Sequence, residues 1–243
     1  MKNNIRNRVF VLFSALALLI MGCGASPKTV KRMQILEEGV TNPTTPKEIE
    51  DAIRKYGTRI EDILLAQEQV GIWYKLLGTR YLDSKMYNEA LKAFQKAIEF
   101  YPENGNLYYY VGICAGYMAQ SALDYAASGS TAQKYNYLKL SEAAYLRALE
   151  IEPRYVRALY ALSVLYVFEL DDSAKAVPLL EKLLTIDTKH IDAMFVLARA
   201  YYSMYQVDKA VAIYDRIIEI APRERKDDAE ANKRQALEGY GRS

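Results

Sequence analysis

The sequence of 243 residues contains few of the residue types from which active sites are usually built. It has two cysteines and one histidine, too few for most metal sites or for a cysteine–histidine nucleophile pair. Lys and Arg number 32 and Asp and Glu 30, so no strong positive field indicates a nucleic-acid partner. Glycine and proline, at 12 and 7 residues, are too scarce for a collagenous or low-complexity chain. We therefore expect no catalysis, no metal, no cofactor and no nucleic-acid binding.

Hydrophobic side chains are abundant, at 51% of the residues, and 12% of the residues are aromatic. This composition is sufficient for a packed core in a chain of this length. No glycine-rich phosphate loop, HExxH motif or Gly-x-Ser-x-Gly motif occurs. The composition thus favours a folded, non-catalytic protein.

Residues 1–22 have the layout of a secretory signal peptide. A basic start precedes an apolar run from Val9 to Met21, which is shorter than the roughly 20 residues that a membrane-spanning helix needs. The segment Ile20-Met21-Gly22-Cys23 resembles the bacterial lipobox, although Met21 is larger than the usual residue. The resemblance implies that Cys23 carries a lipid and becomes the first residue of the mature chain. The alternatives are an ordinary signal peptide with a chance cysteine and a retained anchor helix.

Residues 23–45 are rich in Ser, Pro, Thr, Asn and Lys and predict a lipidated flexible tether. Such a segment would reach roughly 25 Å from the membrane. Without residues 1–22 the chain has 29 basic and 30 acidic residues, so its slight positive charge belongs to the signal. The lipobox resemblance implies a bacterial cell-envelope location on the periplasmic face. Gly24, rather than Asp, after the cysteine favours the outer membrane over the inner.

After Pro46 the hydrophobic residues follow a helical period, and no strand pattern persists, so we expect an all-α fold. A pattern of 34 residues also recurs. In residues 71–104 its markers have the spacings of a tetratricopeptide repeat, and this segment resembles that family at every marker: Tyr74, Leu77, Gly78, Tyr81, Ala90, Phe94, Ala97 and Pro102. The same frame over residues 191–224 gives Met194, Leu197, Ala198, Tyr201, Ala210, Tyr214, Ile217 and Pro222.

Two irregular copies lie between these. The second repeat has a 17-residue insertion, and the third has markers displaced by one and Thr188 where proline is usual. The four repeats are 71–104, 105–155, 156–190 and 191–224, within 71–224. The resemblance implies a tetratricopeptide α-solenoid, which is a right-handed superhelix of antiparallel helix pairs.

The two ends of such a stack need polar covers, because one helix pair cannot bury both of its faces. We expect an N-terminal capping helix in residues 46–70, or a helix pair if Gly57 breaks it. Residues 225–243 are largely polar and predict a C-terminal capping helix.

The tetratricopeptide resemblance also implies a concave groove lined by positions 2, 5, 9, 12 and 13 of each repeat. Lys75 matches a cation of members that clamp a carboxylate, but Thr79 replaces their asparagine, so we do not expect that clamp. The exposed aromatic rings favour an amphipathic helix or an extended peptide as the ligand, unless several of them pack against neighbouring pairs. The predicted groove residues are Lys75, Tyr109, Tyr117, Arg157, Tyr160, Phe168, Phe195, Arg199 and Tyr202.

The insertion in the second repeat predicts a hairpin that projects roughly 12 Å beyond its neighbours. Its tip would lie at residues 128–131. Aromatic residues in the 117–138 hairpin either pack internally or contact another subunit, in which case the hairpin would make a homo-oligomer.

The remaining polar candidates have structural explanations. His190 lies at the junction of the third and fourth repeats, with no nucleophile beside it in sequence. Cys114 lies on an apolar helix face, where a buried, unreactive thiol is usual. Asp171 and Asp172 are typical of a helix start.

The sequence therefore predicts a membrane-anchored scaffold lipoprotein that binds a protein partner through an aromatic groove. Lipidated tetratricopeptide proteins of outer-membrane-protein assembly and pilus biogenesis resemble it in layout, which suggests envelope assembly. The alternative is an accessory lipoprotein of a periplasmic solute-binding, tripartite transport system that handles a small ligand.

Overall fold

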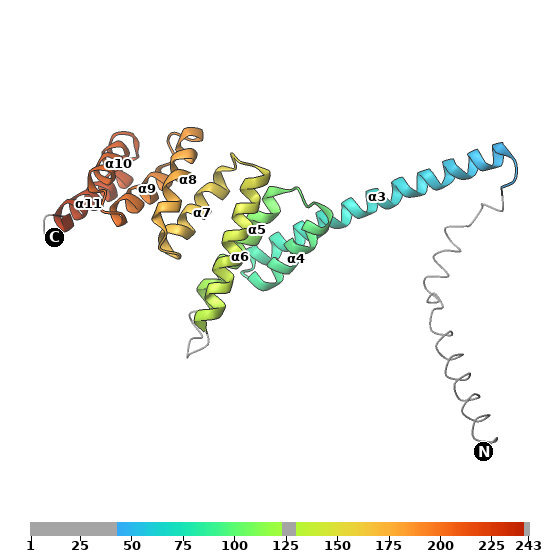
Figure 1. Cartoon of the computed structure of the whole chain (residues 1–243), viewed down its shortest axis with the longest axis horizontal. Helices are drawn as coiled ribbons and strands as arrows, with labels where there is room; N and C mark the ends of the chain where they lie inside the picture. The colour runs from blue at the N-terminus through green and yellow to red at the C-terminus, as the bar shows by residue number, and fades with distance from the viewer. Residues whose placement is uncertain (1–42, 123–129, 241–243) are drawn as a thin grey trace, which may run out of the picture. The chain divides into compact units, whose positions relative to one another are not determined.

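A computed structural model of the chain describes residues 43–122 and 130–240, and all regular secondary structure in these ranges is helical (Figure 1). The predicted all-α fold is confirmed. The signal peptide, Cys23, most of the tether and part of the predicted hairpin tip lie outside the described residues. The helices are α3 (Pro46–Asp83), α4 (Tyr87–Phe100), α5 (Gly105–Ser121), α6 (Ser130–Ile151), α7 (Val156–Phe168), α8 (Ser173–Ile186), α9 (Ile191–Ser203), α10 (Val207–Ile220) and α11 (Arg223–Tyr240).

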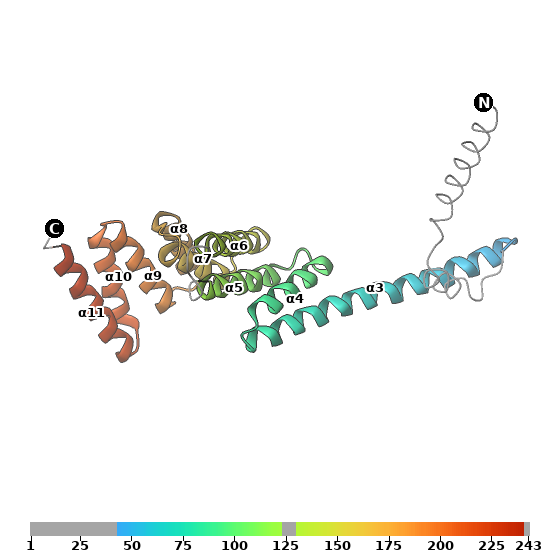
Figure 2. The same cartoon turned by 90° about the horizontal axis from the view of Figure 1, so that it is seen from below.

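The chain divides into two units, residues 1–63 and residues 64–243. In the second unit the helices follow one another as stacked pairs (Figures 1 and 2). Helix α5 packs on α6, α7 on α8 and α9 on α10, and α4–α5, α6–α7 and α8–α9 join successive pairs. This is the solenoid of helix pairs that the 34-residue pattern predicts.

Short polar side chains cap the starts of α5 and α8. The Asn104 side chain accepts a hydrogen bond from the Asn106 amide, and that of Asp172 accepts one from the Lys175 amide. Such side chains satisfy amides that have no partner in the first turn of a helix. The structure thus places Asp172 at a helix start, as the sequence predicts.

The turns within three of the pairs share one backbone conformation. Lys85, Asp171 and Tyr205 have φ values of 59°, 50° and 60°, the left-handed region that non-glycine residues adopt infrequently. Asp171 lies one position later in its repeat than the other two. The one-residue displacement seen in the third repeat is therefore absorbed at this turn.

Glycine allows the helices of a pair to approach closely. A Cβ atom on Gly112 would lie 2.4 Å from the Tyr145 ring, and one on Gly78 would lie 2.8 Å from the Phe94 ring. Real side chains do not come so close, so each glycine is required for the ring to pack flat against the facing helix. The Ser141 hydroxyl donates a hydrogen bond to the Gly112 carbonyl at 2.9 Å and ties α6 to α5.

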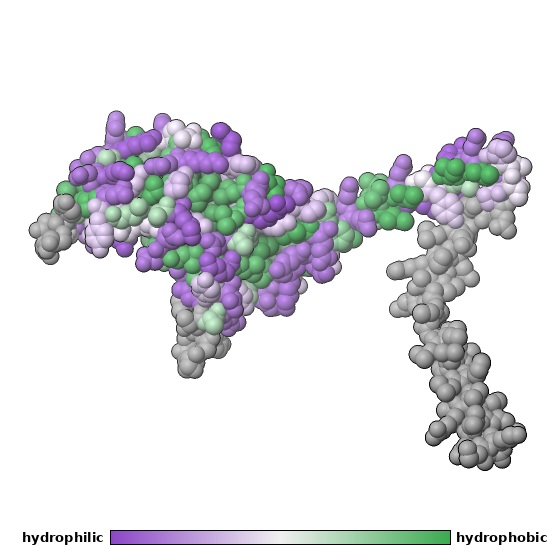
Figure 3. Space-filling model, in the orientation of Figure 1, coloured by the Kyte–Doolittle hydropathy of each residue, from purple (hydrophilic) through white to green (hydrophobic). Residues whose placement is uncertain are grey.

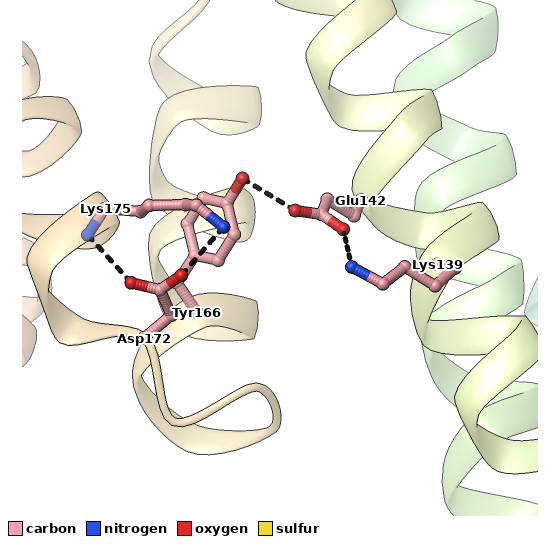
Figure 4. Close-up of polar contacts among 5 residues, drawn as sticks. All are labelled: Lys139, Glu142, Tyr166, Asp172 and Lys175. Atoms are coloured by element: carbon pink, nitrogen blue, oxygen red, sulfur yellow. Dashed lines mark hydrogen bonds and ion pairs between the residues drawn. The ribbon is translucent and has the colours of Figure 1, made fainter.

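A tyrosine clasp joins each of two successive repeats to the one before. In the first clasp, the Tyr166 hydroxyl of α7 donates to Glu142 of α6 at 2.9 Å (Figure 4). The Lys175 amine lies 5.2 Å from the centre of the Tyr166 ring. Burial alone would raise the pKa of Glu142, but hydrogen bonds from Lys139 and Tyr166 lower it below its usual value.

The second clasp repeats this arrangement one repeat later. The Tyr201 hydroxyl of α9 donates to Glu181 of α8 at 2.6 Å, and the Lys209 amine lies over the Tyr201 ring. Tyr166 and Tyr201 occupy the same repeat position, so the clasp is a periodic feature of the array.

Helix α3 differs from the expected N-terminal cover. It is a single helix of 38 residues that runs through Gly57 into the first helix of the first repeat, so residues 46–70 are not a separate capping helix or helix pair. The helix continues through Gly57 because one glycine destabilises a helix by only about 1 kcal/mol. A capping box stabilises the start of α3: the Thr45 hydroxyl and the Glu48 carboxylate each accept a hydrogen bond from the other residue's amide. Residues 61–70 are exposed throughout, and hydrophobic surface lies along α3 (Figure 3).

Helix α11 matches the expected C-terminal cover. Its small residues Ala229 and Ala236 are buried, at 0% and 4% exposure, against α10, which it contacts along its length. Its remaining side chains are mainly charged and exposed. The array therefore ends in a polar surface on this side.

Candidate partner-binding groove

The first helices of the second, third and fourth repeats, together with α11, border two neighbouring cavities. We call them the central cavity, of about 390 Å³, and the C-terminal cavity, of about 320 Å³. Both volumes lie in the range of binding pockets in proteins. Phe168, at the end of α7, lines both cavities and is 56% exposed.

Aromatic side chains from α5 and α7 surround the central cavity. Tyr109 and Tyr117 lie two turns apart on one face of α5, and Tyr160 and Phe168 lie two turns apart on α7. Tyr117 is held by stacking on Tyr87 of α4, with ring centroids 4.5 Å apart. The rest of the lining combines aliphatic side chains of α5, α6 and α7 with the polar Gln120, Ser141 and Glu169, and the space-filling view shows hydrophobic surface over α7 (Figure 3). This cavity can bind apolar side chains.

The C-terminal cavity combines rings with cations and amides. Phe195, Arg199 and Tyr202 of α9 line it together with Asn232 and Gln235 of α11. The Arg199 guanidinium lies 5.9 Å from the centre of the Tyr202 ring. This site can therefore hold a polar or acidic group beside an apolar one.

Two arginines give the groove its positive charge. Arg157 lies over the Tyr109 ring at 4.5 Å, and Arg199 lies over Tyr202. Neither arginine forms an ion pair with an acidic residue in the described part of the chain. Arg225, by contrast, lies over the Phe195 ring at 4.5 Å and pairs with Asp192 and Asp228. Arg157 and Arg199 are thus the cations available to an acidic ligand.

His190 and Tyr160 connect the groove to the repeat junction. The His190 Nδ1 atom accepts a hydrogen bond from the Ala193 amide at 3.1 Å and so caps α9. Its ring lies 5.2 Å from that of Tyr160. Burial raises the pKa of Tyr160, and the nearby Asp192 carboxylate raises it further. His190 therefore has a structural role at the junction, and its ring also packs beside the groove residue Tyr160.

The structure brings eight of the nine predicted groove residues to the two cavities or to a ring that lines them. The six aromatic residues among them are all at least partly exposed. Lys75 is the exception, because it lies on α3 and lines neither cavity.

Sequence reasoning missed part of the cavity walls. Tyr145 and Tyr214, which occupy the repeat position of the marker Phe94, line the central and the C-terminal cavity respectively. Gln235 and Asn232 of α11, expected only as a polar cover, line the C-terminal cavity. A recurring position could have indicated the two tyrosines, since both occupy the same place in their repeats.

The predicted hairpin is present in its described part. Helices α5 and α6, with 17 and 22 residues, are longer than the 13 or 14 residues of α7–α10. Tyr137 and Leu138 pack into the core, whereas Tyr135 is 55% exposed. Lys134 of α6 pairs with Glu169 after α7 at 2.9 Å. Much of the hairpin's apolar surface is therefore used internally.

The remaining chemical candidates are not brought together. Cys114 is fully buried, and burial raises the pKa of its thiol to about 12, which keeps it protonated and unreactive. Among the described residues, no group of three or more His, Cys, Asp or Glu could hold a metal ion. No helix in the described ranges has the length and apolar character to cross a membrane.

Comparisons with known proteins agree with this architecture. A family model described as a tetratricopeptide repeat matches residues 72–104, and a second model of the same description matches residues 167–232. A curated "TPR repeat-containing protein" of Borreliella burgdorferi is 22% identical over 203 residues, which cover 82% of this chain and 86% of that protein.

Solved structures share the fold. A thermophilic TPR protein of Thermus thermophilus has a TM-score of 0.54 at 21% identity, over 78% of this chain and 92% of its own. MamA of Desulfovibrio magneticus RS-1 has a TM-score of 0.53 at 14% identity, over 71% and 92%. YrrB, described as a TPR protein with an unusual peptide-binding site, has a TM-score of 0.50 at 17% identity, over 68% and 80%.

Proposed function

We propose, from the premise that this chain is a tetratricopeptide repeat protein, that it is a non-enzymatic scaffold whose groove captures a segment of a partner protein. Proteins of this family mediate protein–protein interaction and are typically not enzymes. The observation that carries the proposal is the central cavity, which α5 and α7 line with four partly exposed aromatic rings and several aliphatic side chains. Rings of this kind bind strongly at little entropic cost.

The partner segment should combine apolar anchors with acidic side chains. The central cavity accepts the anchor, and the C-terminal cavity, which shares Phe168, accepts a second contact. Arg157 and Arg199 have no acidic partner among the described residues, so a carboxylate of the ligand could form an ion pair with each of them. An amphipathic helix or an extended peptide can supply this combination.

A photo-crosslinking residue at position 160, in living cells, tests the groove and identifies the partner. We expect a discrete crosslinked product that is lost in the Phe168→Ala variant. Binding of the identified partner to Tyr160→Ala/Phe168→Ala should weaken about thirtyfold or more. Tyr135→Ala, which removes an exposed ring outside both cavities, is the matched control. Unchanged binding by the double variant would refute the groove.

We also propose that the scaffold is held in the bacterial cell envelope by a lipid on Cys23, on the periplasmic face and in the outer membrane rather than the inner. The lipobox-like segment supports this proposal. Labelling of cells with radioactive palmitate should mark the wild-type protein and Cys114→Ser but not Cys23→Ser. Label that persists in Cys23→Ser would contradict lipidation at this residue.

Two pathways are compatible with such a scaffold. Envelope assembly, as in outer-membrane-protein or pilus biogenesis, fits a groove that captures peptides. The transport alternative draws support from the central cavity, whose size and aromatic lining also suit a small ligand. Genes for a solute-binding protein and a permease beside this gene would favour transport, and pilus or barrel-assembly genes would favour assembly.

A further inference from the structure

The first helix of the array exposes positions that every later repeat buries. At the third position of the repeats, Leu107, Ala158 and Ala193 are each 0% exposed. At the seventh position Val111, Leu162 and Leu197 are 4%, 0% and 2% exposed. The corresponding residues of α3, Trp73 and Leu77, are 60% and 41% exposed.

This difference has a simple cause. In the inner repeats the preceding helix pair covers these positions, through the α4–α5, α6–α7 and α8–α9 contacts. On α3 the exposure of Trp73 and Leu77 shows that no described helix of the second unit covers these positions. The uncovered surface, which we call the α3 outer face, consists of Leu65, Ala66, Gln69, Ile72, Trp73, Leu76 and Leu77, all of them exposed.

The α3 outer face is large enough for a specific but weak interface. Leu65, Ile72 and Leu76 recur at helical spacing, with Trp73 beside them, and they are 63%, 42%, 48% and 60% exposed. Their exposed surface, with that of Leu77, is on the order of 500 Å². Two such faces together would bury about 1,000 Å², which is the lower limit for a biological interface.

The charges along the edge of this face are self-complementary. Glu68 and Lys75 are exposed or half-buried, lie two turns apart on the same edge, and form no ion pair with any described residue. In two antiparallel helices related by a twofold axis, the same edges of both helices meet. An axis between residues 71 and 72 brings Glu68 of each copy opposite Lys75 of the other.

We propose that a second copy of this chain covers the α3 outer face, with its own α3 running antiparallel. The pairing buries Trp73 and Ile72 in both copies and forms two Glu68–Lys75 ion pairs. A parallel arrangement would bring different edges together and lose both pairs. The dimer uses none of the residues that line the groove, so both copies remain able to bind a partner.

Sedimentation of the full chain in a mild detergent, at about 50 mM salt, tests the pairing. We expect a monomer–dimer equilibrium in the micromolar range. Trp73→Ala should weaken the dimer about thirtyfold or more, with an unchanged circular dichroism spectrum because this side chain is mostly exposed.

Charge reversal gives the sharper test. Glu68→Lys alone and Lys75→Glu alone each place like charges opposite one another twice per dimer, and each should weaken association about tenfold. The double variant should restore it, and so should an equal mixture of the two single variants, whose copies complement each other. Lys92→Glu, a reversal on exposed α4, is the control and should have no effect.

The outcomes separate clearly. A wild-type chain that stays monomeric at about 100 μM, or reversals that are not rescued by the double variant and by the mixture, would overturn the antiparallel dimer. A dimer that resists Trp73→Ala but dissociates when Tyr135 is changed would place the contact on the hairpin and would likewise overturn it.

Discussion

The two ends of the repeat array expose different surfaces: a polar one at the C-terminal end and a hydrophobic one at the N-terminal end. At the C-terminal end α11 turns two buried alanines, Ala229 and Ala236, toward α10 and exposes acidic and basic side chains outward. At the N-terminal end α3 exposes Trp73 and Leu77 at positions that are buried in every later repeat. A stack of helix pairs needs a polar surface at each end to stay soluble. The chain covers the C-terminal end of the array with its own α11, and the second copy that we propose would cover the N-terminal end.

The same substitution at the two ends should have very different consequences. Ala229→Asp places a charge where the alanine is 0% exposed, and an unpaired buried carboxylate should lower the free energy of unfolding by about 3 kcal/mol or more. Ala66→Asp makes the same change on the α3 outer face, where Ala66 is exposed, and should shift that free energy by less than about 0.5 kcal/mol. Urea unfolding at submicromolar concentration, below the range that we propose for the dimer, measures both. Equal effects would refute the contrast between the ends.

Replacing a glycine by alanine should have opposite effects on stability inside the array, at Gly112, and in the part of α3 that precedes the array, at Gly57. Gly112→Ala forces a Cβ to within 2.4 Å of the Tyr145 ring, and this overpacking should lower the free energy of unfolding by about 2 kcal/mol. Nothing lies within 4 Å of a Cβ on Gly57, so Gly57→Ala should stabilise the helix by about 0.5–1 kcal/mol. Urea unfolding measures the first effect, and slower amide hydrogen exchange around residue 57 the second. A stabilised Gly112→Ala would show that the α5–α6 contact can relax.

Much of the array follows from residue spacing. The marker residues fix the four repeats, and the one-residue displacement in the third repeat appears as the shift of the left-handed turn from the Lys85 position to that of Asp171. The groove positions followed in the same way, because a repeat places equivalent residues on equivalent surfaces. Tyr109, Tyr160 and Phe168 therefore meet at one cavity although they lie far apart in the sequence.

The remaining features depend on packing between segments that no short pattern relates. Asn232 and Gln235 line the C-terminal cavity because of where α11 packs, and α11 lies outside the repeats, so no repeat position indicates its place. Gly57 destabilises a continuous helix by only about 1 kcal/mol relative to alanine. This cost is too small for the sequence pattern to show whether α3 breaks there or continues. Sequence reasoning therefore located the repeats and most of the predicted residues that line the two cavities, but not the full lining or the uncovered end.

The tyrosine clasps offer a third comparison, because Tyr81 of α3 occupies the same repeat position as Tyr166 and Tyr201. Tyr166 donates to Glu142 and Tyr201 to Glu181 in the preceding helix, whereas the Tyr81 hydroxyl forms no hydrogen bond with a described residue. Tyr166→Phe and Tyr201→Phe should each lower the free energy of unfolding by about 1 kcal/mol. Tyr81→Phe should leave it unchanged, and a comparable loss there would show that the clasp position matters without a preceding helix.

The first clasp should also respond to pH. The hydrogen bonds from Lys139 and Tyr166 leave the pKa of Glu142 below its usual value in the folded protein. The stability that the lowered pKa contributes is present above the pKa of an unfolded glutamate and is lost as the pH falls through the folded value. Unfolding curves measured from about pH 6 to pH 3 should show a smaller loss for Tyr166→Phe than for the wild type.

The smallest effect should come from the capping box at the start of α3, where no other helix supports the chain in the described part of the first unit. The Thr44 and Thr45 amides donate to Glu48 and lower its pKa to about 2. A lowered carboxylate pKa stabilises the folded form above the unfolded pKa, near 4.5, and this contribution fades as the pH falls toward 2. In an NMR titration the Glu48 carboxylate should therefore titrate near pH 2, and the amides of the first turn should stay protected from exchange at about pH 4. Glu48→Gln should remove this protection, whereas Glu61→Gln, in the middle of the helix, should not. A Glu48 carboxylate that titrates near 4.5 would mean that the first turn of α3 frays in solution.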